Sequence, residues 1–145
     1  AHQDAPAYKF IQHHVTCLVA VDAMTRQNGC LEFCSGRHRE GLIAPDDRGC
    51  IAPSVADGMN WEFVEVEPGD VLFFSSYAPH RSAPNTSTES RRAIYLTYNA
   101  ASEGDFREAY YRDKLESFAE RGAAKSSEPP RISKIGHFQG RTVRE

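Results

Sequence analysis

Pro68-Gly69-Asp70-Val71-Leu72-Phe73-Phe74 is the stretch of sequence that is most informative about the fold. A proline–glycine–aspartate triplet is typical of a turn, and the four apolar residues after it suit a buried β-strand. The strand leads on to Tyr77-Ala78-Pro79-His80, so a histidine follows directly at the end of a β segment. The stretch therefore predicts a turn, a buried strand and a polar side chain where the strand ends.

Segments of similar character lie on both sides and predict a mainly β fold. Residues 15–21 are rich in β-branched and apolar side chains, which suits a strand buried on both faces. The other predicted strands are 30–34, 62–67 and 92–98, and the predicted turns and loops are Asn28-Gly29, 41–60 and 84–90. Five or six short strands separated by turns are typical of a sandwich or a jelly-roll-like barrel.

The period of the apolar residues changes after residue 100 and predicts a C-terminal α-helix that ends near Gly122. Ser102 with Asp105 three residues later resembles a capping box. The helical stripe, which we expect to face a core, consists of Phe106, Tyr110, Tyr111, Leu115 and Phe118. We predict one domain over residues 1–122 and a linker or surface tail over residues 123–145.

Composition excludes several classes of protein. The 145 residues carry 17 Lys and Arg against 20 Asp and Glu, a net charge of −3, so no basic face for a nucleic acid is indicated. The longest apolar run, residues 17–21, is far shorter than the ~20 residues of a membrane span. The four cysteines form no CxxC pair, which favours reduced structural thiols and a cytoplasmic location. The chain opens on a polar cluster at Ala1, and we expect it to be the C-terminal part of a longer protein.

Two histidines and one aspartate are candidates for a metal site. On an extended strand residues i and i+2 share a face, so a His2 nitrogen and an Asp4 oxygen can meet at one ion. This pattern is common by chance, and His80 at the end of a β segment is what raises its significance. Two histidines and one carboxylate form the facial triad of non-haem Fe(II) oxygenases, which leaves positions open for a cosubstrate and O₂.

Arg91 is a candidate for binding the far end of that cosubstrate. It follows His80 by eleven residues and starts the next predicted strand. A 2-oxo acid that chelates iron at one end can carry a second carboxylate at the other, and a guanidinium binds a carboxylate with two hydrogen bonds. Because neighbours on a strand point to opposite faces, only one of Arg91 and Arg92 can face inward, and we expect it to be Arg91. The alternative for Arg91 is a surface salt bridge.

Tyrosines and further histidines near these residues are candidates for substrate contacts. Tyr8 follows the His2–Asp4 motif closely and Tyr77 lies just ahead of His80, so both are candidates for lining a substrate pocket. His13 and His14 precede the first predicted strand, either at a pocket rim or, as we favour, in an exposed loop.

Taken together, the motifs resemble the phytanoyl-CoA dioxygenase (PhyH-like) group of Fe(II)/2-oxoglutarate-dependent oxygenases. The resemblance covers about residues 2–100. Its motifs are His2-Gln3-Asp4 with Pro6 and Tyr8, Asn28-Gly29-Cys30-Leu31 with Gly36 and His38, the stretch 68–74, and His80-x-Ser82-x-x-Asn85 with Arg91-Arg92-Ala93. The usual Pro-Gly-Ser-His of the family is Ser35-Gly36-Arg37-His38 here, so the local loop shape differs from the family pattern.

The resemblance implies a double-stranded β-helix, or jelly roll, with iron at its mouth. Family members carry a long segment ahead of the first motif, so this jelly roll is expected to be N-terminally incomplete. By resemblance His2, Asp4 and His80 hold Fe(II), Arg91 binds the distal carboxylate of 2-oxoglutarate, and Ser82 adds a hydrogen bond to it. Related halogenases lack the carboxylate ligand, so its presence at Asp4 favours hydroxylation.

The expected function is therefore hydroxylation of a C–H bond in a small organic substrate, with 2-oxoglutarate and O₂ consumed and succinate and CO₂ released. Neither a nucleic acid nor a membrane is expected as a partner. Two alternatives stay open. One is a non-catalytic or truncated jelly-roll binding module. The other is a cupin-like metal enzyme without 2-oxoglutarate, although such sites usually have three or four histidines and a glutamate.

Overall fold

The structure is a computed structural model that describes residues 1–46 and 49–123. The chain divides into two compact units, Ala1–Glu103 and Gly104–Glu145. The predicted tail lies almost entirely outside the described residues, so the boundary at 122 stays a prediction. Among the described residues no helix is both long enough and apolar enough to cross a membrane.

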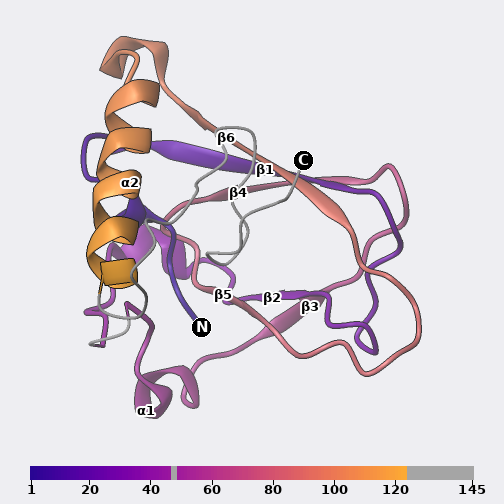
Figure 1. Cartoon of the computed structure of the whole chain (residues 1–145). Coiled ribbons are helices and arrows are strands. Elements are labelled where there is room, and N and C mark those ends of the chain that lie inside the picture. The colour runs from indigo at the N-terminus through magenta and orange to yellow at the C-terminus, as the bar shows by residue number, and fades with distance from the viewer. Residues whose placement is uncertain (47–48, 124–145) are drawn as a thin grey trace. The chain divides into compact units, whose positions relative to one another are not determined.

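The described part of the first unit contains two antiparallel three-stranded sheets (Figure 1), which confirms the mainly β prediction. The first has the order β4-β1-β6 and consists of β1 (His14–Ala20), β4 (Val71–Ser75) and β6 (Ala93–Asn99). The second has the order β3-β2-β5 and consists of β2 (Leu31–Phe33), β3 (Glu62–Val64) and β5 (His80–Ser82). Short helical segments connect them: η1 (Ala5–Ala7), η2 (Arg37–Glu40), α1 (Pro53–Ala56) and η3 (Ala101–Glu103).

The hydrophobic core lies between the two sheets. Leu18 and Phe74 belong to the first sheet, Leu31 and Phe33 belong to the second, and all four are buried in one cluster. The Phe33 and Phe74 rings contact each other with centroids 5.0 Å apart. Each fully buried side chain of this size contributes about 1.5–3 kcal/mol, so these contacts hold the sheets face to face.

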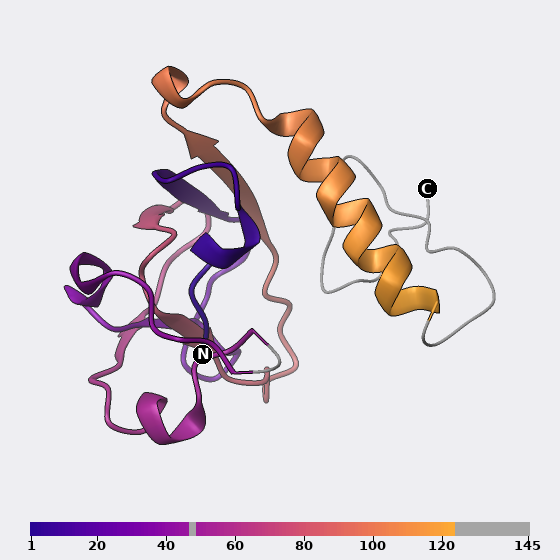
Figure 2. The same ribbon diagram turned by 90° about the vertical axis from the view of Figure 1, so that its left-hand side faces the viewer.

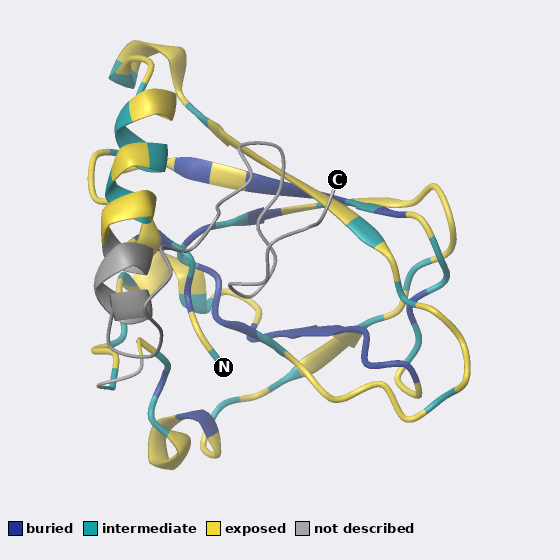
Figure 3. Ribbon diagram, viewed as in Figure 1, coloured by how far each residue is buried: buried dark blue, intermediate teal, exposed yellow. Residues whose placement is uncertain are grey.

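The strands of the first sheet bury mainly one face, although Cys17 on the other face is also buried. Leu18 pairs with Leu72 on β4 and with Tyr95 on β6, and paired residues share a face, so these three point toward the core. The opposite face is open, and Figure 3 shows β6 largely exposed. Its exposed apolar residues are Val15, Val71, Phe73, Ile94, Leu96 and Tyr98. The prediction that the first strand is buried on both faces is therefore wrong at Val15, which is 42% exposed.

The Asn28-Gly29 turn is present and depends on glycine. Gly29 has φ +82°, and an added Cβ would lie 2.2 Å from the carbonyl oxygen of Ala83. Asn28 Oδ1 accepts a hydrogen bond from the Thr25 N–H, and its amide donates to the Ala23 carbonyl. Both residues are needed. Asn28 closes the turn with its hydrogen bonds, and Gly29, which has no side chain, lets the loop that carries Ala83 approach the turn.

Residues 41–60 are not the uninterrupted loop that the sequence predicts. They contain α1, which begins at Pro53 and lies at the bottom of Figure 2. Proline suits the first turn of a helix because its missing N–H has no partner there in any case. The Trp61 indole N–H donates to the Ala56 carbonyl and so holds the end of this helix.

The described part of the second unit is the helix α2 (Arg107–Ala123). The capping interaction differs from the prediction, because Asp105 Oδ1 accepts a hydrogen bond from the Arg107 N–H while Ser102 lies in η3. Within the predicted stripe, the Tyr110 and Tyr111 rings lie 5.3 Å apart. The side chain of Phe118 lies outside the described residues.

Candidate metal centre

The start of the chain and the beginning of β5 are joined through their main chains. The His2 N–H donates to the His80 carbonyl and the His80 N–H donates to the His2 carbonyl, each over 3.0 Å. Figure 2 shows the N-terminal segment, in indigo, running through the middle of the first unit to η1. This isolated antiparallel bridge brings two histidines from distant parts of the sequence to neighbouring positions.

Asp4 is placed by a turn and not by an extended strand. Its φ and ψ are −78° and −24°, so the prediction that His2 and Asp4 share a face of one strand is wrong in its geometry. The main chain turns into η1 here, with Pro6 near its start, and the N–H groups of Asp4 and Ala5 both donate to the Ser76 carbonyl. The turn still points the carboxylate back toward both histidines.

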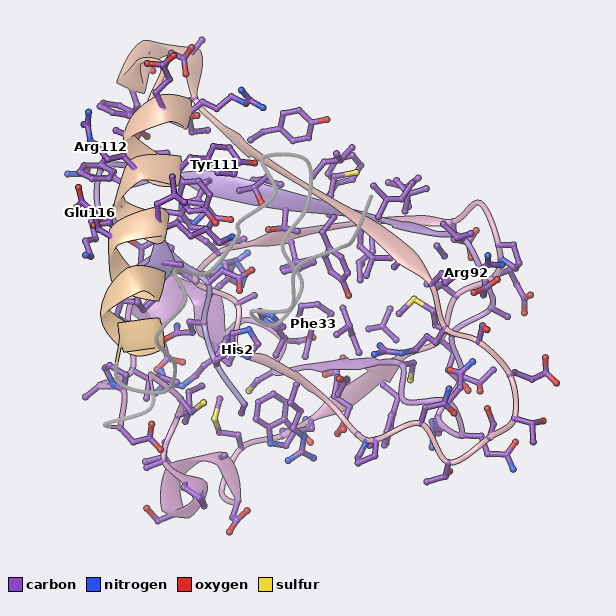
Figure 4. The ribbon with its side chains drawn as sticks, viewed as in Figure 1. His2, Phe33, Arg92, Tyr111, Arg112 and Glu116 are labelled. Carbon is purple, nitrogen blue, oxygen red and sulfur yellow. The ribbon has the colours of Figure 1, made fainter. Side chains whose placement is uncertain are left out.

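The three predicted ligand residues come together. Asp4 Oδ1 lies 3.4 Å from His2 Nε2 and 3.6 Å from His80 Nε2. One ligand atom from each of the three lies within 4.8 Å of the others. The side chain of His80 is 8% exposed, that of Asp4 25% and that of His2 48%, so the cluster opens to solvent on the His2 side. Figure 4 shows His2 beside Phe33, whose ring stacks on the imidazole of His80.

The protonation state of the cluster suits a cation. His80 Nδ1 lies 3.0 Å from the Ala78 carbonyl, which can only accept, so Nδ1 carries the proton and Nε2 keeps its lone pair. Burial lowers the pKa of His80, against the opposing charge of Asp4, and favours this neutral form. Burial acts to raise the pKa of Asp4, but its hydrogen bond with His2 and the proximity of the imidazoles of His80 and His2 outweigh burial, and the pKa is lowered.

Gln3, between two of the three residues, is a structural element that the sequence analysis did not single out. Its side chain is buried. The amide nitrogen donates to the carbonyls of Tyr77 and Gly41, and Oε1 accepts from the Ile43 N–H. Gln3 thus ties the start of the chain to the segment before His80 and to the loop after η2.

The two neighbouring arginines have different environments. Arg92 makes a two-pronged ion pair with Asp22, with both N···O distances 2.8 Å, and lies across the first unit from His2 in Figure 4. Arg91 has no hydrogen bond or ion pair among the described residues. It precedes β6 by two residues, and its charge acts on Tyr95 of that strand. Ser82 pairs with Leu31 and His80 with Phe33, so both lie on the core-facing side of the second sheet.

The tyrosines and histidines considered as substrate contacts lie partly in the interior and partly at the surface. The Tyr8 hydroxyl donates to Thr97 Oγ1 over 3.2 Å, and the Tyr8 ring meets the His14 ring edge-on at 4.3 Å. Tyr77 is half-buried, and its carbonyl receives the Gln3 amide. The exposed position favoured for His14 is wrong: it is 3% exposed and neither ring nitrogen has a hydrogen-bond partner among the described residues. His13 is exposed and pairs with Glu103.

Comparison with known proteins fits this geometry. Residues 1–93, more than half of the chain, match the profile of the phytanoyl-CoA dioxygenase (PhyH) family. The chain therefore belongs to this family, as the motifs predicted.

Two curated relatives show a narrower similarity. A methylphosphonate hydroxylase of Gimesia maris is 54% identical over 145 residues, which is 100% of this chain and 55% of that protein. A 2-aminoethylphosphonate dioxygenase of an uncultured bacterium (HF130_AEPn_1) is 42% identical over 119 residues, 81% of this chain and 45% of that protein. The chain spans about half the length of these relatives.

Solved structures share the fold. EctD from S. alaskensis, crystallised with 2-oxoglutarate and 5-hydroxyectoine, superposes with a TM-score of 0.60 at 24% identity, over 70% of this chain and 38% of that one. EvdMO1 superposes with a TM-score of 0.55 at 28% identity, over 68% of this chain and 22% of that one.

Proposed function

We propose that this chain carries the iron and cosubstrate sites of an Fe(II)- and 2-oxoglutarate-dependent dioxygenase that hydroxylates a C–H bond of a small organic phosphonate. The observation that supports this most directly is the convergence of His2, Asp4 and His80 within 4.8 Å. Two imidazoles and one carboxylate are the donor set of non-haem Fe(II) oxygenases. The two sheets are, in this proposal, part of a double-stranded β-helix with this cluster at its mouth.

The protonation and hydrogen bonding of His80 meet the requirements for a metal ligand. A metal-binding histidine must be neutral, with its other nitrogen bonded to an acceptor, and His80 meets both conditions through Ala78. With 2-oxoglutarate and O₂, Fe(II) held there supplies the oxidation that converts 2-oxoglutarate to succinate and CO₂ and leaves the second oxygen atom on a substrate carbon as a hydroxyl group. Asp4 contributes the negative charge that offsets part of the charge of the ion.

In this proposal, Arg91 and Ser82 bind the distal carboxylate of 2-oxoglutarate. Arg91 lies just before β6 without an ionic partner among the described residues, so its guanidinium is free to pair with the distal carboxylate of 2-oxoglutarate. Ser82 shares its face of β5 with His80 and offers a hydroxyl to the same carboxylate. Because Arg92 is already paired with Asp22, it is not available for this role.

The substrate class rests on the relatives. The two relatives with the highest identity given above are named for methylphosphonate and 2-aminoethylphosphonate. Both substrates contain a phosphonate group next to a carbon that can be hydroxylated. Tyr8 and Tyr77 are the proposed substrate contacts on this chain, because both adjoin the motif that carries Asp4.

A two-part experiment tests the proposal. Fe(II) and 2-oxoglutarate are first added without oxygen, and the visible charge-transfer band of the chelate is recorded for the native chain and for Asp4→Ala. O₂ and either methylphosphonate or 2-aminoethylphosphonate are then admitted, and succinate and hydroxylated product are measured by NMR. We expect the band and substrate-dependent succinate only in the native chain. A native chain without the band, or a variant with the same band, contradicts the assignment.

A further inference from the structure

The core-facing side of β6 carries a tyrosine to which none of the motifs assigns a role. Tyr95 pairs with Leu18, which is fully buried, so its side chain lies on the interior face of the first sheet. Two neighbours on that face are already engaged. Ala93 packs against the hydrophobic core, and Thr97 accepts the hydrogen bond from Tyr8. The Tyr95 hydroxyl has no hydrogen-bond partner among the described residues.

Tyr95 lies within the electrostatic influence of two opposite charges. Partial burial raises its pKa, the nearby Arg91 guanidinium opposes that change, and the Asp4 carboxylate adds to it. Asp4 belongs to the candidate metal centre, whereas Arg91 lies just before β6, four residues ahead of Tyr95. Two residues further along the same face, Thr97 pairs with Thr16, which pairs with Phe74, and the Phe74 ring lies 5.2 Å from the ring of His80. This face of β6 therefore borders the candidate metal centre that the proposed function assigns to one end of 2-oxoglutarate.

The side chain can also be reached by a ligand. Tyr95 is 42% exposed although it faces the interior, so part of its side chain is accessible within the described part of the chain. A protonated phenol donates one hydrogen bond and cannot carry a charge at neutral pH, which suits a carboxylate acceptor already paired with an arginine.

We propose that the Tyr95 hydroxyl donates a hydrogen bond to 2-oxoglutarate and is a third cosubstrate-binding group beside Arg91 and Ser82. This inference rests on the proposed function, because it uses the same metal centre and the same cosubstrate. It goes further by assigning the middle of the β6 face to the dicarboxylate.

The test compares Tyr95→Phe with Tyr98→Phe. Both substitutions remove only a hydroxyl, but Tyr98 lies on the opposite, outer face of β6 and is 56% exposed. The dissociation constant of 2-oxoglutarate is measured by titrating the Fe(II)-loaded chain without oxygen and following the charge-transfer band. We expect about tenfold weaker binding in Tyr95→Phe and no change in Tyr98→Phe, since a hydrogen bond to a charged group is lost only in the first.

A second readout separates this role from a structural one. The KM for 2-oxoglutarate is expected to rise in Tyr95→Phe while the KM for the phosphonate and the melting temperature stay at their native values. Unchanged 2-oxoglutarate binding, or a rise confined to the KM of the phosphonate, overturns the inference. If the native chain itself gives no band with Fe(II) and 2-oxoglutarate, the proposed function fails, and that outcome is distinct from a native band that Tyr95→Phe leaves intact.

Discussion

The main chains of His2 and His80 are hydrogen-bonded to each other in both directions, over 3.0 Å each way. The relative position of these two residues is therefore set by the backbone and does not require a metal ion. Asp4 is fixed in the same manner, since its N–H donates to the Ser76 carbonyl. The candidate centre is preorganised, so side-chain substitutions there are expected to change metal binding more than folding.

Metal affinity is the first property to measure. Asp4→Ala removes the only carboxylate of the cluster, and we expect Fe(II) or Co(II) to bind more than about 100-fold more weakly, because even outer partners of metal ligands contribute about 10- to 100-fold. Isothermal titration calorimetry gives the affinity. His38→Ala, which removes an exposed histidine outside the cluster, serves as the control. Equal loss in both variants contradicts the placement of the metal.

The two neighbouring arginines are expected to behave differently. Arg91→Ala leaves the distal carboxylate of 2-oxoglutarate without its cation, which corresponds to about 1.5–3 kcal/mol, or roughly a 10- to 100-fold rise in the 2-oxoglutarate requirement. Arg92→Ala breaks the exposed pair with Asp22 and should leave this requirement unchanged. Steady-state kinetics with varied 2-oxoglutarate decides the matter. A rise in Arg92→Ala alone shows that the strand faces are assigned the wrong way round.

Substitution of Gln3 should affect both stability and metal binding. Gln3→Leu keeps the size of the side chain but leaves the carbonyls of Gly41 and Tyr77 and the N–H of Ile43 without their partner. An unsatisfied buried group costs about 1–3 kcal/mol, so we expect a loss of about 3 kcal/mol in unfolding free energy and weaker metal binding. Urea denaturation measures the first. Gln27→Leu, at an exposed position, is the control, and equal stability of the two variants refutes the role of Gln3.

The buried His14 makes the free energy of unfolding depend on pH. Burial lowers its pKa from 6.5, against the opposing charges of Asp4 and Glu103, so at pH values between the folded pKa and 6.5 His14 binds more protons in the unfolded chain than in the folded chain. Stability therefore falls as the pH is lowered through this range. His80 adds an effect of the same sign. His14→Phe should flatten the dependence of unfolding free energy between about pH 7.5 and about pH 5.5. An unchanged slope means that His14 is not neutral in the folded state.

Comparison of Gly29 with Gly69 distinguishes the cost of backbone strain from the cost of a steric clash, because the two glycines have similar backbone angles. Gly29 and Gly69 have φ +82° and +93°, and both strain any other residue by about 1–2 kcal/mol. Only Gly29 has a neighbour in the way, the Ala83 carbonyl. Gly29→Ala should therefore lower the melting temperature clearly more than Gly69→Ala does in differential scanning calorimetry. Equal effects show that the loop bearing Ala83 can move aside.

Much of the fold could be predicted from local patterns. The run of apolar residues at 71–74 and the turn before it correspond to β4, and the alternation after Arg92 corresponds to β6. The metal candidates were also predictable, because their residue types and the strand before His80 are visible in the sequence. These features depend on periodicity and on side-chain chemistry, which short segments already contain.

Other features could not be predicted because they depend on distant contacts. The conformation of Asp4 is fixed by a hydrogen bond to Ser76, and the role of Gln3 is fixed by three partners far away in sequence. The interior position of His14 follows from the strand register and from the cover that Tyr8 provides. For α1, by contrast, a local signal existed in Pro53, but a single turn of helix gives too short a pattern to recognise.

The bond between Gln3 and Tyr77 spans 74 positions and has a kinetic consequence. Contacts of such long range form only after the intervening chain has been ordered, since the entropy of closing a loop of this length must be offset by contacts already made. The pairing of β1 with β6 has a similar range, since it joins His14 to Asn99, so docking of the first residues and assembly of the first sheet meet a similar entropic cost. Capture of a metal ion during refolding would accordingly report the formation of these long-range contacts and not an early local nucleus.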